Sequence, residues 1–383
     1  MAAWLTVLEA LHLETGRPAY RVLFEFWLKI FGLAFGLGVM SAFQFGTNWS
    51  VLSRMSGPIQ GPLLSYETFT AFALEARPHF RSLSRGPVVL SVVDRDGGVG
   101  NHAFRVLDHG QQQLDEVPFG YVVENGAFVP DDWTKIIFNS VVWVRFPHML
   151  LGAYLTGAFC VAATGAWYLL RKKSQAEAHI MLHMGLFLAA VLVPIQILFG
   201  HLAGDYVHQY QPAKFAAIEG RWHNEQPAGE VLLAIPDPAS ETNHYEIKIP
   251  VLGSLIGSMS FTSKEVGLTD FPPQDRPPVL IPFFTFRIMV GCGLVMLALA
   301  WLGSYLSLKD RIERSRFVLW LVFLSFPLPY TAEVGRQPWT VRWSYRSSYR
   351  RSVLGRGPFH LSADAALHDD QLQCLQREGR ILV

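Results

Sequence analysis

Two side chains that can ligate iron lie near the beginning of two long apolar segments. His148 belongs to VRFPHMLLGAYLTGAF, and Met289 belongs to FFTFRIMVGCGLVMLALAWLG. An imidazole nitrogen and a thioether sulfur can hold both faces of a low-spin haem iron and raise its potential. Each residue alone has a simpler interpretation, because a histidine can bond to a neighbouring helix and a methionine usually fills space in packing. The pair together therefore predicts an axial ligand set for a haem.

Other charged residues lie in similarly apolar surroundings. Arg287 precedes Met289 by two residues, and as a permanent cation it could meet the propionates of such a haem. Glu67 and Glu75 are eight residues apart in SYETFTAFALEA, which places them about 80° apart around a helix. Carboxylates within an apolar segment suggest a proton path or a site near bound metal. A surface helix would explain the same spacing, and both interpretations stay open.

Two further motifs combine polar side chains with apolar or aromatic ones. In HQYQPAKFAAIEGRW, the residues Gln211, Lys214 and Glu219 offer hydrogen-bond donors and acceptors that suit a polar head group. An ordinary solvated helix is the alternative for that motif. In TAEVGRQPW, Glu333 and Arg336 stand at a membrane boundary, where an aromatic belt with snorkelling charges is the simpler explanation.

These residues require elements that can hold them within a membrane. The chain has 383 residues, of which 50% are hydrophobic and 16% are charged. Its mean hydropathy of +0.23 lies outside the usual range of soluble proteins and indicates an integral membrane protein. At the length of a bilayer crossing, the sequence predicts four spans and two weaker apolar segments: 24–45, 147–170, 180–200 and 281–307, followed by 61–76 and 317–330. The predicted fold is therefore all-α, a polytopic bundle of transmembrane helices.

Basic residues predict the orientation of this bundle. RKK at 171–173 and KDRIERSR at 309–316 end spans that are two crossings apart, so both lie on one side, which we take as cytoplasmic. The loop at 201–276 then faces outward, and its ten acidic against five basic side chains agree with that placement. His148 and Met289 consequently lie at similar depth, near the outer face.

Charge and cysteine content exclude other classes of site. A net charge of +1 leaves no uniformly basic surface for nucleic acid. The three cysteines, Cys160, Cys292 and Cys374, are far apart and form no C-x-x-C pair. The sequence therefore indicates neither a disulfide framework nor a thiolate metal site.

Taken in this order, the motifs resemble the large subunit of the cytochrome bd family of quinol oxidases. The resemblance covers residues 20–76 and 118–340 and rests on six segments: FQFGTNWS, YETFTAFALEA, RFPHMLLGAYLTGAF, QPAKFAAIEGRW, FRIMVGCG and AEVGRQPW. The short outer loop is similar to that of the cyanide-insensitive branch of the family. The combination of segments is far more specific than any one of them.

The resemblance implies which residues hold the haems. His148 and Met289 match the axial ligands of the low-spin haem b, with Arg287 beside them. Glu333 matches the carboxylate that ligates the high-spin haem b, and Arg336 lies in the same motif. The third cofactor implied by the resemblance is haem d, where dioxygen is reduced.

The resemblance also implies a reaction and its partners. Glu67 and Glu75 match acidic residues near haem d and on the proton route from the cytoplasm, and Gln211, Lys214 and Glu219 match the quinol-binding loop. Ubiquinol or menaquinol would be oxidised near the outer surface, and dioxygen would be reduced to water. Protons would be taken from inside and released outside, so a gradient forms without a pump. A small second subunit and the lipid of a bacterial inner membrane would be the other partners.

The sequence departs from the family pattern in four places. The family's first span, with a histidine ligand, is expected to be missing, and so is a short apolar segment between Tyr330 and Thr331. The polar segment 77–117 replaces the helix after Glu75, and the Arg- and Ser-rich tail 341–383 replaces the closing helices. We hypothesise that the reading frame was lost at these two places, and an uninterrupted frame in the gene would refute this. A surface loop and a disordered tail are the alternative.

These departures divide the chain and leave three functional interpretations. The expected parts are an N-terminal transmembrane part at 1–76, an aberrant polar segment at 77–117, a transmembrane hairpin with a haem ligand at 118–200, a periplasmic quinol-binding loop at 201–276, a transmembrane part with haem ligands at 277–340 and an aberrant basic tail at 341–383. The chain is predicted to be an oxidase subunit. A haem-b electron-transfer or quinol-binding module, or a non-functional membrane fragment, is the alternative.

Overall fold

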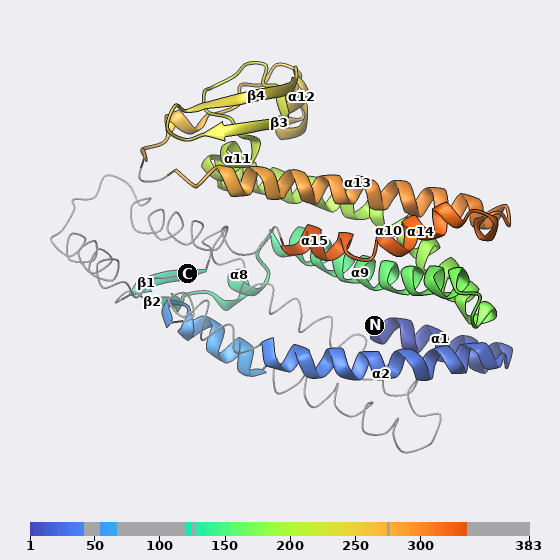
Figure 1. Cartoon of the computed structure of the whole chain (residues 1–383). Coiled ribbons are helices and arrows are strands. Elements are labelled where there is room, and N and C mark those ends of the chain that lie inside the picture. The colour runs from blue at the N-terminus through green and yellow to red at the C-terminus, as the bar shows by residue number, and fades with distance from the viewer. Residues whose placement is uncertain (42–53, 67–119, 125–126, 274–275, 335–383) are drawn as a thin grey trace.

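A computed structural model describes residues 1–41, 54–66, 120–124, 127–273 and 276–334. Most of these residues are helical, and long helices lie side by side with a small β-containing part at one end (Figure 1). The labelled elements are α1 (Ala2–Thr15), α2 (Pro18–Ser41), β1 (Tyr121–Glu124), β2 (Ala127–Pro130), α8 (Trp133–Ile137), α9 (Val142–Leu170), α10 (Gln175–Tyr210), α11 (Pro212–Glu219), β3 (Glu230–Asp237), β4 (Thr242–Ile249), α12 (Leu252–Ser258), α13 (Leu280–Leu308), α14 (Arg316–Leu324) and α15 (Leu328–Val334). Residues 57–66 are also helical.

Three helical segments within the described residues are long and apolar enough to cross a membrane. They are Trp133–Leu170, Gln175–Tyr210 and Leu280–Leu308. The all-α membrane fold is therefore confirmed, but the predicted number of four clear spans was one too many for this part of the chain. The predicted span 24–45 corresponds to α2, which carries Arg21, Glu25 and Lys29 in its first half. Residues 42–45 of that predicted span lie outside the described residues.

Helices α9 and α10 pack closely because small residues line their contact. A Cβ added to Gly185 would lie 2.6 Å from the carbonyl oxygen of Ala158, and one added to Gly165 would lie 2.7 Å from that of Ala178. Such approach of two backbones is the usual way in which membrane helices associate, since lipid removes the hydrophobic driving force. Leu182 and Leu186 fill the adjoining core together with residues of α14.

Helix α13 packs antiparallel on α10, and α15 packs on α13 and α9 (Figure 1). Gly303 of α13 faces Leu186 of α10, since an added Cβ would lie 2.8 Å from a methyl group of that leucine. Nearer the beginning of α13, Met296 and Ala300 pack in a cluster with residues of α9 and α10. The sequence predicted one weak apolar segment at 317–330; the structure divides it into α14 and α15.

Helices α1 and α2 form a hairpin beside α9 and α10. Gly16 adopts φ 65°, and its N–H donates to the carbonyl of His12, which ends α1 with a left-handed cap. Trp27 of α2 is buried in a cluster that includes Val161 of α9 and Met181 of α10. The hairpin therefore belongs to the same bundle.

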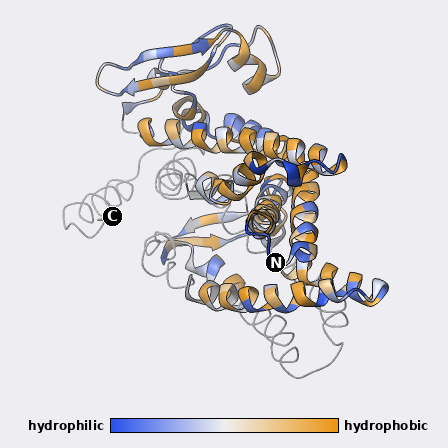
Figure 2. Ribbon diagram, turned by 45° about the vertical axis from the view of Figure 1, so that its right-hand side comes forward, coloured by the Kyte–Doolittle hydropathy of each residue, from blue (hydrophilic) through white to orange (hydrophobic). Residues whose placement is uncertain are grey.

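The segment between α10 and α13 folds as a small outer part. Strands β3 and β4 pair antiparallel, with Glu230 opposite Ile249 and Asp237 opposite Thr242. They lie over α11 and the beginning of α13 (Figure 1), and polar residues are more frequent here than in the helices below (Figure 2). The helix 57–66, the β1–β2 hairpin and α8 meet in a separate hydrophobic cluster, which contains Ile59, Phe128 and Ile136.

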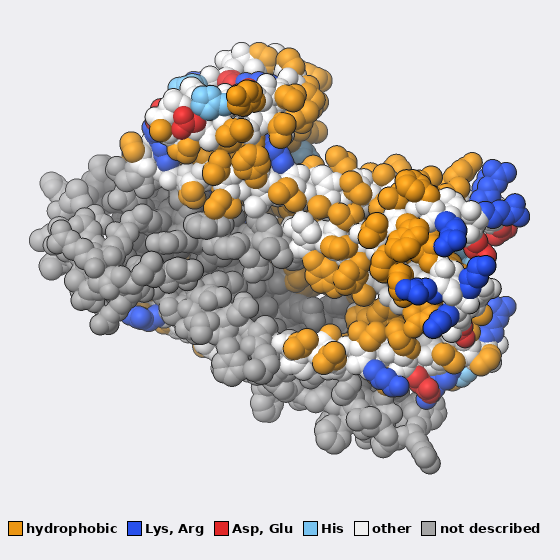
Figure 3. Space-filling model, in the orientation of Figure 1, with side chains coloured by type: hydrophobic (Ala, Val, Ile, Leu, Met, Phe, Trp, Pro, Cys, Tyr) orange, Lys and Arg blue, Asp and Glu red, His pale blue; other side chains and the backbone are white. Residues whose placement is uncertain are grey.

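Basic residues gather at the opposite end of the bundle, while apolar side chains cover its flanks (Figure 3). Ile312, between α13 and α14, packs against Leu170 at the end of α9. Nearby, His179 Nε2 lies 2.9 Å from Glu313 Oε1. The two basic segments therefore lie at the same end, as the orientation argument requires. The expected aberrant segments 77–117 and 341–383 lie outside the described residues, and their boundaries stay predictions.

Candidate functional site

His148 lies in the second turn of α9 and faces α10. Pro147 precedes it inside the helix. A Cβ added to Gly200 of α10 would lie 3.2 Å from His148 Cε1, and Gln196 Nε2 lies 3.5 Å from His148 Nε2. Gln196 Oε1 is buried and accepts no hydrogen bond from the described part of the chain. A polar pair is thus buried between two apolar helices.

Met289 lies on the face of α13 that packs against α10. Met289, Met296 and Gly303 are seven residues apart, so they share one face of the helix. Helices α10 and α13 are antiparallel, and Gly303 of α13 meets Leu186 of α10. Met289 lies fourteen residues before Gly303, and Gly200 lies fourteen residues after Leu186, so Met289 and Gly200 are at the same level. The register therefore directs both predicted ligands toward the same part of α10.

The surroundings of this pair fit a haem in three respects. The donors are of the right type, an imidazole and a thioether. The amide oxygen of Gln196 lacks a partner among the described residues. Gly293 lies four residues after Met289 on the same face of α13, and a Cβ there would meet no described atom within 4 Å, so there is space beside Met289 in the described part. No group of three or more His, Cys, Asp or Glu side chains that could hold a metal occurs within the described ranges.

Four other predicted site residues are not described in this detail. The backbone of Glu333 belongs to the last turn of α15. Glu67, Glu75 and Arg336 lie outside the described residues, so the structure does not test their roles.

Arg287 points away from Met289 and binds the outer part. Two residues correspond to about 200° around a helix, so the two side chains leave α13 on opposite faces. The Arg287 guanidinium donates from Nη1 to the carbonyl of Ile218 (2.8 Å) and from Nε to that of Val231 (3.0 Å), and Nη2 also contacts Val231. It lies 3.5 Å from the centroid of the Phe283 ring. The predicted contact of Arg287 with haem propionates stays a prediction, and the observed contacts join α13 to α11 and β3.

The end of α11 explains why Arg287 finds free carbonyls there. The helix begins with Pro212 at its first position and ends at Gly220, which adopts φ 67°. The last carbonyls of a helix have no partner within it, and a cation at the C-terminus also favours the helix dipole. Arg287 therefore caps α11 from the neighbouring helix.

The three residues predicted for the head-group motif are all buried. Gln211, Lys214 and Glu219 expose 1%, 6% and 4% of their surfaces. The alternative of an ordinary solvated helix is therefore wrong. Glu219 Oε2 has no hydrogen-bond partner among the described atoms. Burial of polar groups without full pairing is costly, which is a reason to expect a bound polar molecule here.

Glu230, at the start of β3, is a further acidic residue at this place. Its Oε1 lies 3.8 Å from Arg287 Nη2, and its side chain is 12% exposed. Burial, together with the hydrogen bond that protonated Glu230 donates to Glu219 and the charge of Glu219, raises the pKa of Glu230 to about 9, although Arg287 and Arg221 act in the opposite direction. Glu230 was not predicted as a site residue, because its only signal in the sequence is a carboxylate before the apolar run VLLAI.

A second buried acid, Glu265, lies 3.9 Å from Arg221, measured from Oε2 to Nη1. His208 Nε2 lies 2.8 Å from Glu265 Oε2, and the hydroxyls of Ser258 and Ser263 donate to Oε1. Burial by itself raises the pKa of Glu265, but hydrogen bonds from His208 and Ser258 and the charges of His208 and Arg221 outweigh it, so the pKa is lowered. Sequence reasoning missed this cluster as well, because its members are far apart in the chain.

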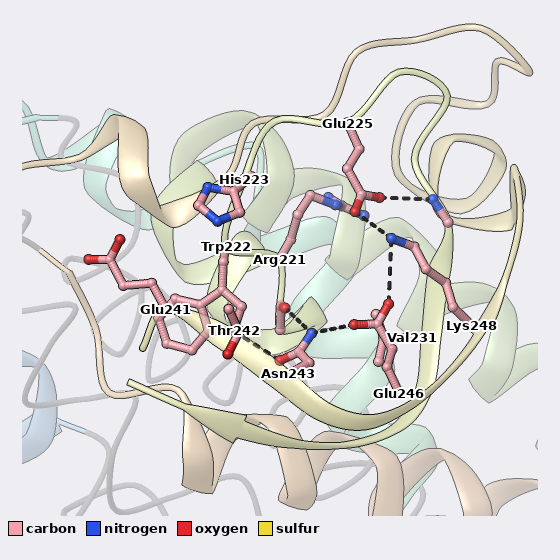
Figure 4. A pocket seen from close by; sticks show the side chains of 12 residues that line it. Arg221, Trp222, His223, Glu225, Val231, Glu241, Thr242, Asn243, Glu246 and Lys248 are labelled. Carbon is pink, nitrogen blue, oxygen red and sulfur yellow. Dashed lines mark hydrogen bonds and ion pairs between the residues drawn. The ribbon is translucent and has the colours of Figure 1, made fainter. Parts of the chain in front are cut away.

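A polar cavity of about 260 Å³ opens beside these residues, between the turn after α11 and the β3–β4 hairpin (Figure 4). Asn243 donates to the carbonyl of Gly220 at 2.9 Å and accepts from Trp222 Nε1 at 2.9 Å. Lys248 is paired with Glu225 and Glu246. The outer part is thus held together by polar contacts, and its cations and anions are largely matched.

Comparison with known proteins agrees with this arrangement. A sequence model of the family described as Cytochrome bd terminal oxidase subunit I matches residues 1–77 and 114–359. Cytochrome bd ubiquinol oxidase subunit 1 of Bacillus subtilis (strain 168) is 30% identical over 88% of this chain and 78% of its own length. Cytochrome bd-II ubiquinol oxidase subunit 1 of Escherichia coli (strain K12) is 26% identical over 94% of this chain and 86% of its own length.

The fold is also that of a solved relative. The structure of bd oxidase from Geobacillus thermodenitrificans matches 91% of this chain and 84% of its own chain, with a TM-score of 0.75 and 24% identity. The family is one of haem-containing bacterial membrane oxidoreductases in electron transport, and the three apolar spans described above suit such a protein. The chain therefore belongs to the cytochrome bd terminal oxidase subunit I family.

Proposed function

We propose that this chain is the subunit of a terminal oxidase that oxidises membrane quinol near its outer face and passes the electrons to dioxygen, which becomes water. The observation that carries the proposal is the capping of α11 by Arg287. Helix α11 carries the buried residues of the head-group motif. Arg287 connects this helix to the turn of α13 that also carries Met289. A quinol bound at α11 would thereby lie next to the first electron acceptor.

The proposed acceptor is a low-spin haem b held by His148 and Met289. His148 lies against Gly200 of α10, the helical register of α13 on α10 puts Met289 at the level of the same glycine, and imidazole and thioether are suitable axial donors, which supports this assignment. When bound, this group supplies one-electron transfer without binding dioxygen, because protein ligands hold both faces of its iron. The role of this chain is to position the two donors and to bury them in apolar surroundings.

The oxygen-reducing part of the proposal rests on the family resemblance. Glu333 would ligate the high-spin haem b with Arg336 nearby, and Glu67 and Glu75 would serve haem d and the proton route. Protons taken up inside and released outside would form a gradient without a pump.

The partners of the reaction are also proposed. Two relatives are named as ubiquinol oxidase subunits and another, from Bacillus subtilis, as a putative menaquinol oxidase subunit, so either quinol is a candidate. A small second subunit, dioxygen and membrane lipid complete the set. The length of the outer loop 201–276 favours the cyanide-insensitive branch.

A reduced-minus-oxidised absorption spectrum tests the haem assignment. Membranes would carry this chain with its small partner subunit co-expressed. A long-wavelength haem d band supports the oxidase, a b-type band alone would indicate an electron-transfer module, and no haem signal would indicate an inert fragment. His148→Ala and Met289→Ala should each abolish the low-spin b signal, and an unchanged signal in either variant would refute that assignment.

The quinol site is tested separately from the haem. Lys214→Ala and Glu219→Ala should lower the rate of quinol oxidation while haem content stays the same. Lys264→Ala is a matched control, because this lysine lies in the same outer part and is exposed. Loss of haem in step with activity would mean that the two buried residues act only in folding.

A further inference from the structure

Two carboxyl groups from different elements meet beneath the outer part. Glu219 is the last residue of α11, and Glu230 is the first residue of β3. They are in hydrogen-bond contact, Glu219 is 4% exposed, and Glu219 Oε2 has no partner among the described atoms. A buried pair of carboxyls can be retained only if positive charge or a shared proton compensates it.

Two cations, Arg287 and Arg221, lower the pKa of Glu230, but burial and the neighbouring Glu219 raise it by more. Arg287 lies 3.8 Å from Glu230, and its N–H groups donate to the carbonyls of Ile218, Val231 and Phe283 instead of to the carboxyl. Arg221 contributes at longer range, and its Nη1 lies 3.9 Å from Glu265, a second buried acid.

On β4, Lys248 is paired with Glu225 and Glu246 and so does not act on this pair. The two carboxyls are both largely buried, and burial outweighs the effect of the two arginines on Glu230. One shared proton is therefore the simplest arrangement for the two carboxyls.

We propose that Glu230 and Glu219 share one proton, and that this carboxyl pair takes up a second proton from quinol as the quinol is oxidised. The inference rests on the proposed function, which places quinol at α11. The raised pKa of Glu230 means that the pair holds one proton at neutral pH, so one carboxylate is available. A like-charge pair of carboxyls is a common arrangement for holding and releasing single protons.

The step balances as follows. The O–H bond of the hydroquinone breaks, and a new O–H bond forms on a carboxylate oxygen of the pair. The electron would go to the low-spin haem that His148 and Met289 would hold according to the proposed function. The pair afterwards releases its proton to the outer aqueous phase and returns to the singly protonated state. The second quinol proton and electron repeat the sequence.

The test uses Glu230→Gln and Glu230→Asp in the complete oxidase with its small subunit. Glu230→Gln should lower kcat for quinol by about a hundredfold, the low end of the range for loss of a general acid or base, since Glu219 remains. It should also flatten the dependence of the rate on pH, while the low-spin b spectrum stays unchanged. Glu230→Asp should restore part of the rate. Asp237→Asn, at the other end of the same strand and beside His244, is the matched control and should change neither quantity.

A second measurement does not depend on the rate. Infrared difference spectra of the purified oxidase, taken between the quinol-reduced and oxidised forms, should contain a band of a protonated carboxyl that disappears in Glu230→Gln. If the wild type oxidises quinol and Glu230→Gln keeps its rate, pH profile and carboxyl band, the inference is overturned. Equal loss of haem in both Glu230 variants would also overturn it, because the residue would then be structural. Failure of the wild type to oxidise quinol would instead refute the proposed function.

Discussion

Replacing Gly220 by alanine tests the junction between the outer part and the bundle. Gly220 adopts φ 67° at the end of α11, and a Cβ there would lie 2.7 Å from Phe283 Cε2 and 2.8 Å from Phe283 Cδ2. Phe283 is fully buried, and the Arg287 guanidinium lies on its ring. The added methyl group therefore cannot be accommodated unless Phe283 moves, and such a movement would displace Arg287 as well.

Two costs add in this substitution. A non-glycine residue in the left-handed region costs about 1–2 kcal/mol. Overpacking of a buried site costs about 1–3 kcal/mol. The expected destabilisation of the junction is thus about 2–5 kcal/mol, which is 30-fold or more in the local opening equilibrium, at about 1.4 kcal/mol per factor of ten.

Hydrogen exchange measures this effect directly. Amides of α11 in the purified oxidase should exchange faster in Gly220→Ala, and the KM for quinol should rise more than kcat falls, because the head-group residues lose their position. Gly204→Ala is the control: this glycine lies inside α10, a Cβ there meets no described atom within 4 Å, and alanine favours helices by about 1 kcal/mol. Exchange of α11 amides that is the same in both variants would refute the reasoning.

Three further predictions concern packing, capping and protonation. Gly185→Val should reduce folded oxidase in membranes by forcing α9 and α10 apart. Gly157→Ala should not, since a Cβ at Gly185 meets a backbone atom within 3 Å and one at Gly157 meets no described atom within 4 Å; equal yields in detergent extracts would contradict this. Arg287→Met should raise the protease sensitivity of the outer part, because α11 and β3 lose their charged donor, at about 1.5–3 kcal/mol per hydrogen bond; unchanged digestion would count against the capping role. Glu230 has a raised pKa in the folded state, so its contribution to stability is complete below the ordinary value of 4.5 and is lost as pH rises toward about 9. Thermal stability of the wild type should therefore fall across this window by up to about 1.4 kcal/mol per pH unit, and Glu230→Gln should have a shallower slope in melts between pH 5 and 9.

The spans could be predicted from the sequence because lipid imposes a simple rule on them. Apolar length alone predicted 147–170, 180–200 and 281–307, and α9, α10 and α13 contain all three ranges. The ends of the helices were harder to predict where they are polar. Helix α10 continues to Tyr210, ten residues beyond the predicted span 180–200, because the added residues are too polar to count as part of a membrane crossing. Proline explains a second difference: Pro327 and Pro329 divide the predicted run 317–330 into α14 and α15.

The acidic pair could not be predicted, because it depends on contacts between distant parts of the chain. Glu219, Glu230 and Arg287 come from a short helix, a strand and a span, and no local pattern relates them. By contrast, the motif around Gln211 and Lys214 was visible as a cluster of polar residues. Even there the sequence left a solvated helix open, since burial depends on the hairpin and α13 that cover α11.

Helix α13 gives the proposed reaction a spatial order. Quinol oxidation yields electrons and protons, which must part if the protons are to leave on the outer side. Met289 and Arg287 belong to one turn of α13 but point in opposite directions, one toward α10 and the other toward α11 and β3. Electrons would therefore leave through the α10 side of the turn, and protons through the acidic pair on its outer side. Because a helical turn is rigid, a quinol held at α11 would lie near the electron acceptor and near the acidic pair at the same time.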